Sequence, residues 1–413
     1  MRIPRTFKRW VGVLGLAAAT AMLVTACGGG DDNNGGGGNG GGSVSDGNTA
    51  NTAVITVGTG VARVINIPTV NVKICAPGTS NCQVVNNVLV DTASYGLRLV
   101  SSALSSGVLS NLPRTTSGGA PVVECGKFVS SYTWGTVRTV DLTIGSEQAG
   151  SLPVQIIGDL GTSNVPSSCT NGGASANTAS DLGANGILGI GPAPVDCGTN
   201  CATSTSATYN NYYACPNGNS SCTVALVPVA QQVANPVHRF ATDNNGVIVQ
   251  MPTISNSGQG SATGLLVFGI GTQSNNALGA STVLTSSTTG DVSATFLGSS
   301  ATAFFDTGSN AYFFNDSSQT KCSTNTQFYC PSSSTTYTAT LTGRNGASGG
   351  VSMPVVNADS LFANASTFAF NDIAGPFGAA GWLDLGMPHF YGKTIYFGMD
   401  KTSTGGAQPY VAF

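Results

Sequence analysis

The sequence predicts an all-β protein with two lobes. Short segments rich in β-branched residues are interrupted by Gly, Pro and Asn, helical periodicity is scarce, and 413 residues suit a barrel-rich fold with two lobes. The segments with this pattern are residues 54–57, 61–67, 70–74, 84–90, 137–144, 154–157, 265–268, 303–305 and 394–397. Only residues 97–104 and 225–233 carry a pattern that predicts short helices.

Composition narrows the class of protein further. Asp, Glu, Lys and Arg together make up 8% of the chain, against about 25% in an average soluble protein. The hydrophobic fraction of 41% argues against a disordered chain, and the net charge is −3 with no basic run. These values argue against nucleic acid as a partner.

The N-terminus has the pattern of an export signal. A cationic head is followed by an apolar stretch over residues 11–24, which is short for a membrane span. The stretch ends at Val24-Thr25-Ala26-Cys27, which resembles the lipobox of bacterial lipoproteins. This resemblance implies lipidation of Cys27 and attachment to a membrane through that lipid; an ordinary signal peptide with an incidental Cys is the alternative.

These motifs predict the order of parts along the chain. We expect a lipoprotein signal peptide over residues 1–26 and a Gly-rich flexible tether over 27–52. A first lobe over 53–232 and a second over 233–413 then complete the chain. Gly28 follows the lipidated Cys, and by resemblance to other lipoproteins the absence of Asp there favours the outer membrane of the bacterial cell envelope.

Ten cysteines follow Cys27, and an even number in an exported chain predicts five disulfides. Two pairs are close enough in sequence to close single loops, Cys75 with Cys82 and Cys322 with Cys330. We expect a third bond between Cys125 and Cys169. The sequence leaves the pairing open for Cys197, Cys201, Cys215 and Cys222. A second pair of ligands to match Cys197 and Cys201 is missing, so we expect no metal and no cofactor.

An internal repeat carries the candidate chemistry. An apolar run leads into Asp91-Thr92-Ala93-Ser94, and a second apolar run leads into Asp306-Thr307-Gly308-Ser309. An apolar-Gly element follows each motif, at residues 186–191 in the first half and at 382–386 in the second. Each Asp ends a strand expected to be buried, where a lone charge is costly. The repeat therefore predicts that Asp91 and Asp306 meet at one site.

Two carboxyl groups in contact share one proton, because both cannot ionise. One carboxylate then activates a water molecule while its protonated partner hydrogen-bonds to the substrate carbonyl. We expect the hydroxyls of Ser94 and Ser309 to donate to the outer carboxylate oxygens, and the N–H groups of Ala93 and Gly308 to bind the inner ones. The hydroxyls of Thr92 and Thr307 are expected to bond across the pseudo-twofold axis.

The order of these motifs resembles that of the pepsin-like aspartic peptidases over nearly all of residues 53–413, and some bacterial lipoproteins share this layout. The resemblance implies two pseudo-symmetric β-barrel-like lobes with an active cleft between them, and a hairpin that folds over the cleft with an aromatic residue near its tip. Tyr132 and Trp134, in Tyr132-Thr133-Trp134-Gly135-Thr136, fit that flap; aromatic packing on a sheet edge is the alternative. Two departures weaken the implied catalysis: Ala93 replaces the usual Gly, and the flap segment is short.

Three functions remain open from the sequence. The first is an endopeptidase that cleaves exported polypeptides with Asp91 and Asp306. The second is a non-catalytic module that binds a protein ligand, like the plant xylanase-inhibitor relatives of pepsins. The third is a disulfide-rich surface lipoprotein with structural duties. We expect a monomer in each case, and no recognisable motif surrounds His238 or His389 to support a serine triad.

Overall fold

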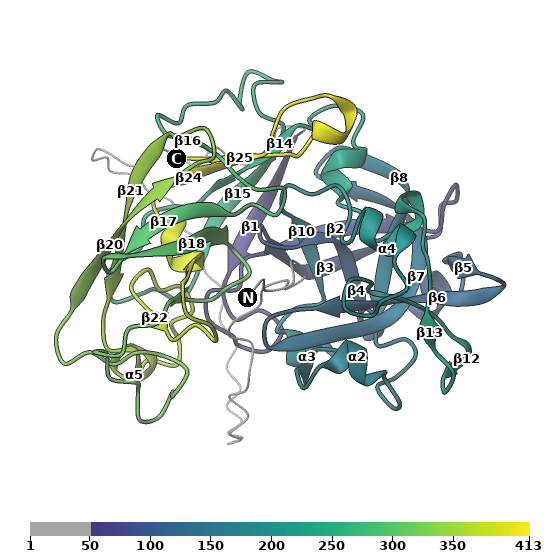
Figure 1. Cartoon of the computed structure of the whole chain (residues 1–413), viewed down its shortest axis with the longest axis horizontal. Helices are drawn as coiled ribbons and strands as arrows, with labels where there is room; N and C mark the ends of the chain where they lie inside the picture. The colour runs from purple at the N-terminus through teal and green to yellow at the C-terminus, as the bar shows by residue number, and fades with distance from the viewer. Residues whose placement is uncertain (1–50) are drawn as a thin grey trace, which may run out of the picture.

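The computed structural model describes residues 51–413. The predictions for residues 1–26, for Cys27 and for most of the tether lie outside this range. Within it the chain is built almost wholly of strands, and the two halves of the chain form two lobes that lie side by side in Figure 1. The predicted all-β, two-lobed fold is confirmed.

Six antiparallel strands connect the two halves. Their order is β1 (Thr52–Val57), β15 (Ala262–Phe268), β14 (Gly246–Gln250), β24 (Thr394–Gly398), β25 (Tyr410–Ala412) and β16 (Val283–Thr285). Burial along β1 largely alternates, as expected for a strand with one covered face. The lobe boundary at residue 232 stays a prediction; this connecting sheet takes β1 from the first part and the other five strands from the second.

The first lobe contains the longest hairpin of the described chain, β7 with β8. Its strands are β2 (Thr69–Cys75), β3 (Cys82–Asp91), β4 (Tyr95–Val100), β5 (Thr116–Ser117), β6 (Ala120–Lys127), β7 (Ser131–Ile144), β8 (Glu147–Ile157), β9 (Ala174–Ser175), β10 (Gly186–Ile190), β11 (Tyr212–Ala214), β12 (Pro216–Asn219) and β13 (Thr223–Val224). The predicted helix at 97–104 is wrong, because residues 95–100 pair as β4 with β10 and β8, and this tertiary pairing outweighs the local pattern.

The second lobe has its own sheet, in the order β21-β20-β17-β18-β23-β19-β22. These strands are β17 (Val292–Phe296), β18 (Ser299–Asp306), β19 (Tyr312–Phe313), β20 (Thr335–Thr342), β21 (Ser348–Val355), β22 (Ala374–Gly375) and β23 (Trp382–Gly386). Buried side chains from both lobes and from the connecting sheet form one continuous apolar cluster. The lobes therefore share a core at their junction.

Helices are short in the described part of the chain. The α-helices are α1 (Ser106–Leu109), α2 (Ser167–Thr170), α3 (Ala179–Leu182), α4 (Thr199–Thr203) and α5 (Ala358–Phe362), and the 3₁₀ turns are η1 (Ser101–Ala103), η2 (Val229–Gln231), η3 (Pro236–Arg239), η4 (Met387–His389) and η5 (Thr402–Thr404). The predicted helix at 225–233 is therefore reduced to the single turn η2. Over residues 51–413 no helix combines the length and the apolar character that crossing a membrane requires.

Five disulfides are formed, as the cysteine count predicts. Cys75–Cys82, Cys125–Cys169 and Cys322–Cys330 match the expected pairs, and the open pairing resolves into Cys197–Cys201 and Cys215–Cys222. Asp359 lies with Cys322 and Cys330 in a group whose potential metal-ligand atoms are within 4.8 Å of one another. Because the two sulfurs are bonded to each other, neither is available as a thiolate ligand.

Candidate active site

Each motif Asp ends a strand beside a glycine of a parallel neighbour. Asp91 closes β3 opposite Gly189 of β10, and Asp306 closes β18 opposite Gly386 of β23. A side chain at either glycine is excluded, because a Cβ on Gly189 would lie 2.7 Å from Tyr95 N and one on Gly386 would lie 2.0 Å from Ala311 O. The glycines of the apolar-Gly elements thus allow the turn after each Asp to pack directly against the backbone of β10 or β23.

The two carboxyl groups lie next to each other in the interior. Both Asp91 and Asp306 have no exposed surface. A Cβ placed on Gly308 would be 3.0 Å from Asp306 Oδ1 and 3.0 Å from Asp91 Oδ1, so both carboxyl groups border the same glycine. Burial, followed by the nearby carboxyls of Asp384 and Asp91, raises the pKa of Asp306 well above its ordinary value. Asp306 therefore keeps a proton to a higher pH than an ordinary aspartate.

Reciprocal hydrogen bonds between two threonines hold the turns together. The N–H of Thr92 donates to Thr307 Oγ1 at 3.1 Å, and the N–H of Thr307 donates to Thr92 Oγ1 at 3.0 Å. Each hydroxyl then donates to a carbonyl of the opposite lobe, Thr92 to Phe305 O at 2.9 Å and Thr307 to Val90 O at 2.6 Å. All four bonds are buried and cross between the lobes, so they fix the two aspartates relative to each other.

Backbone N–H groups hold the carboxylates. Ala93 N donates to Asp91 Oδ1 at 2.9 Å and Ser94 N donates to the same oxygen at 3.1 Å, while Gly308 N donates to Asp306 Oδ1 at 2.8 Å. The φ angle of Ala93 is not positive, so an alanine adopts the backbone conformation of this turn without strain. The methyl of Ala93 is buried within a cluster that contains Phe304 and Phe313.

The two serines differ, and one expectation is wrong. Ser309 Oγ donates to Asp306 Oδ2 at 2.9 Å, as expected. The buried hydroxyl of Ser94 has no hydrogen-bond partner within the described residues, so the expected bond to Asp91 is not made. That hydroxyl is packed against β10, where a Cβ on Gly189 would lie 2.8 Å from Ser94 Oγ. The hydroxyl of Ser94 therefore lies close to β10 and is not bonded to the carboxylate.

The expected flap is the β6–β7 hairpin, but its tip differs from the expectation. The N–H of Phe128 donates to Ser131 O at 2.9 Å and closes the turn, so Val129 and Ser130 form the tip. Tyr132 and Trp134 lie beyond it, on β7, in a cluster with the Cys125–Cys169 disulfide. Val129 instead packs against the apolar cluster that contains Ala93.

The ring of Trp134 is held firmly within the first lobe. It meets the Tyr213 ring edge-on with centroids 5.2 Å apart, and its Nε1–H donates to Asn219 Oδ1 at 2.8 Å. Both rings are buried in this cluster of the first lobe. A covering role of Tyr132 and Trp134 over the dyad stays a prediction.

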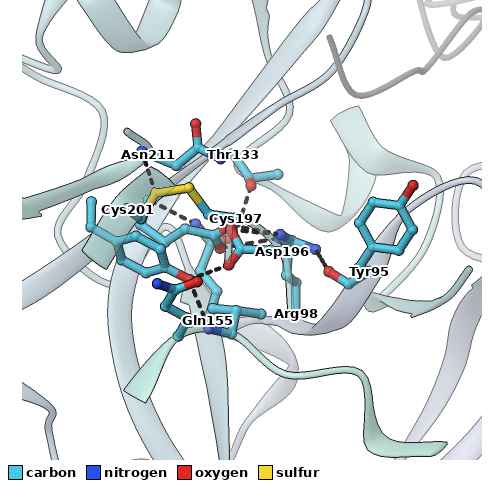
Figure 2. A network of polar contacts seen from close by, with 12 residues as sticks. Tyr95, Arg98, Thr133, Gln155, Asp196, Cys197, Cys201 and Asn211 are labelled. Atoms are coloured by element: carbon cyan, nitrogen blue, oxygen red, sulfur yellow. Dashed lines mark hydrogen bonds and ion pairs between the residues drawn. A yellow bond between two sulfur atoms is a disulfide. The ribbon is translucent and has the colours of Figure 1, made fainter. Parts of the chain in front are cut away.

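A buried ionic network, which no motif in the sequence indicates, lies beside the first Asp motif. Arg98 on β4 binds both oxygens of Glu124 on β6, at 2.5 and 3.1 Å, and donates to Tyr95 O at 2.9 Å. Asp196 lies 3.8 Å from the Arg98 guanidinium, and Figure 2 shows Asp196 between Arg98 and the Cys197–Cys201 disulfide. Burial alone lowers the pKa of Arg98, but Glu124 and Asp196 outweigh it and raise the pKa above its ordinary value. The cation is thus retained in the interior.

No curated protein matches the sequence at a significant level. Among solved structures, the crystal structure of an aspartic proteinase from Irpex lacteus is 14% identical, with a TM-score of 0.49 over 87% of this chain and 97% of that one. In this chain each of the paired Asp turns lies beside a parallel Gly-bearing strand. A family model matches residues 47–413, and the chain therefore belongs to the family described as "Protein of unknown function (DUF3443)".

Proposed function

We propose that this protein is an aspartic-type endopeptidase that acts on polypeptides. The observation that carries the proposal is the pair of buried carboxyls on turns joined by the Thr92 and Thr307 hydrogen bonds. The raised pKa of Asp306 makes it the protonated partner, which polarises the substrate carbonyl. Asp91 then acts as the base that draws a proton from the attacking water. No covalent intermediate is needed, and neither a metal nor a cofactor is part of this mechanism.

The test is cleavage of an unfolded protein across acid to neutral pH. Asp91→Asn and Asp306→Asn should each lower turnover by about a hundredfold to ten-thousandfold, the range that general acid–base catalysis supplies. Asp181→Asn removes one exposed carboxyl of the first lobe and serves as the matched control. Near-native turnover in either dyad variant, with the control intact, would exclude the shared-proton mechanism.

One observation favours a non-catalytic binding module as the second candidate. Asp91 and Asp306 are both fully buried, so a substrate reaches them only after the covering segments move. A module that binds a protein ligand needs no such movement. Binding of a hydroxyl-containing transition-state mimic of aspartic peptidases separates the two: an endopeptidase binds it competitively with substrate, and a module on this fold binds neither substrate nor mimic at the dyad.

We also propose that the protein is lipid-anchored in the bacterial cell envelope, at the outer membrane, and works as a monomer. The support is the lipobox-like Val24-Thr25-Ala26-Cys27 and the Gly-rich stretch after it. Cys27→Ser should release the protein from the membrane fraction or block its maturation. Unchanged fractionation, together with a native mass that includes no lipid, would contradict the anchor.

A further inference from the structure

A third carboxyl group lies beside the dyad, on a strand position where the first lobe has an apolar residue. Asp384 is fully buried in the middle of β23, in register with Phe304 of β18 and Phe313 of β19. The corresponding residue of the first lobe is Ile187, two residues before Gly189 as Asp384 is two residues before Gly386. A carboxyl at an apolar position of this kind is costly when ionised.

The hydroxyl of Ser309 connects this third carboxyl to the dyad. Ser309 Oγ lies 2.7 Å from Asp384 Oδ2 and 2.9 Å from Asp306 Oδ2. A serine hydroxyl carries one hydrogen, so it donates to one of these oxygens at a time. Both contacts become hydrogen bonds only if one carboxyl is protonated and donates to a lone pair of the serine oxygen.

From this geometry we infer that Asp384 is a positioning residue that acts on the dyad through Ser309. Asp384 is held as the neutral acid and donates its hydrogen to Ser309 Oγ, and Ser309 donates its own hydrogen to Asp306 Oδ2. The three carboxyls Asp91, Asp306 and Asp384 then hold two protons between them, where an isolated dyad holds one. The arrangement is one-sided, because the hydroxyl of Ser94 makes no corresponding bond in the first lobe.

Three other titratable groups lie on the elements around Asp384, namely Tyr312, Asp372 and His389. Tyr312 on β19 has a pKa raised by burial and by Asp372, and burial also raises the pKa of Asp372, before β22, to about 6. Burial lowers the pKa of His389 on η4 well below its ordinary value, so the ring is neutral. It packs against Phe305, 5.4 Å between ring centroids. Among the carboxyls of residues 51–413, those that raise the pKa of Asp306 are Asp384 and Asp91.

The consequence for catalysis rests on the proposed endopeptidase function. As long as Asp384 stays neutral, the outer oxygen of Asp306 receives a hydrogen bond from a hydroxyl that an acid polarises. When Asp384 ionises, it competes for the hydrogen of Ser309 and places a second negative charge beside Asp306. Ionisation of Asp384 therefore ends the productive state of the dyad and sets the alkaline limit of activity.

Two substitutions at this position separate hydrogen bonding from ionisation. In Asp384→Asn the amide N–H still donates to Ser309 Oγ, but the group cannot ionise, so the alkaline fall in activity should move to higher pH. Asp384→Ile restores the residue type of Ile187 and removes the donor. It should weaken binding of a transition-state mimic by about two- to tenfold, as expected for loss of a hydrogen bond between two neutral groups. If both variants kept the wild-type pH profile, Asp384 would be only a packing residue.

A readout that does not depend on activity tests the protonation directly. Infrared difference spectra at pH 7 between wild type and Asp384→Asn should contain the carbonyl-stretch band of one protonated carboxyl, lost in the variant. Asp181→Asn, which removes an exposed carboxylate, should lose no such band. If the band is present and no cleavage is found, the proposed function fails and this inference stands. If the protein cleaves polypeptides and the band is absent, the inference fails and the proposed function stands.

Discussion

Thr92 and Thr307 exchange hydrogen bonds across the two lobes, each N–H donating to the other's hydroxyl at 3.1 and 3.0 Å. Because each hydroxyl also donates to a carbonyl of the opposite lobe, two side chains satisfy four buried backbone groups. The dyad geometry therefore depends on residues that take no part in the chemistry.

Substitution of these threonines should show strong coupling. Thr92→Val or Thr307→Val leaves a buried N–H and a buried carbonyl without partners, which costs about 1–3 kcal/mol of unfolding free energy per unsatisfied group. The double variant should lose less than the sum of the single losses, because the two hydroxyls contact each other at 3.5 Å and belong to one hydrogen-bond network. Urea unfolding measures all three, with Thr338→Val on exposed β20 as control. Strict additivity would show that the threonines act independently.

Ala93 and Gly308 should respond differently to exchange of their residue types. Ala93→Gly relieves no strain, since φ is not positive there, and should lower stability by about 0.5–1 kcal/mol through greater freedom of the unfolded chain. Gly308→Ala places a methyl 3.0 Å from both dyad oxygens and should displace a carboxyl. A displacement of about 1 Å lowers turnover by about a hundredfold. This assignment would be contradicted if turnover rose in Ala93→Gly by a larger factor than it fell in Gly308→Ala.

A second carboxyl pair, Glu147 and Asp243, should make stability depend on pH. Burial, and then the charge and hydrogen bond of Asp243, raise the pKa of Glu147 from 4.5 to about 7. The folded protein then binds a proton that the unfolded chain releases, so this contribution to stability is complete below pH about 4.5 and is lost as pH rises through about 7. Thermal unfolding between pH 4 and 8 should be less dependent on pH in Glu147→Gln. An identical pH dependence in the variant, with Asp181→Asn as control, would refute the assignment.

Loss of the buried cation should destabilise the first lobe strongly. Arg98→Met leaves Glu124 and Asp196 as buried carboxyls without their cation, a change that costs about 3–5 kcal/mol in buried ion pairs. The double variant Arg98→Met, Glu124→Leu should recover part of this loss, because one of the uncompensated charges is removed. Denaturant unfolding tests the series against Arg344→Met, an exposed position on the second lobe. A loss below 1 kcal/mol for Arg98→Met would mean that water replaces the cation at no great cost.

The sequence predicts those features of the site whose residues are close together along the chain. The two Asp motifs and the cysteine pairs carry their information in neighbouring residues, so the dyad turns and three of the disulfides could be predicted. The partners of Arg98 are 26 and 98 residues away in sequence, and a single Arg among apolar strand residues gives no sign of either. The hydroxyl of Ser94 was assigned by analogy between the motifs, but the close approach of β10 at Gly189 depends on packing that the motif does not encode.

The role of Asp384 could not be predicted from sequence either. Its segment stood out as an apolar-Gly element, and one acidic residue in such an element has no evident partner in sequence. The contact with Ser309 arises only because β23 runs parallel to β18. A comparison of the two halves position by position, which places Asp384 opposite Ile187, is the signal that identifies it.

The pairing of β1 with β15 has a consequence for how the chain acquires its fold. Thr52 pairs with Val267, so β1 cannot pair with β15 until more than two hundred further residues have been synthesised. Closing such a long loop carries an entropic cost before any pairing rewards it, which slows folding. During synthesis the first lobe can gather its hairpins while β1 remains an open strand edge, available to other extended chains. Maturation of this protein is therefore expected to be limited by the pairing of β1 with β15 and to benefit from a chaperone that covers β1 until β15 is synthesised.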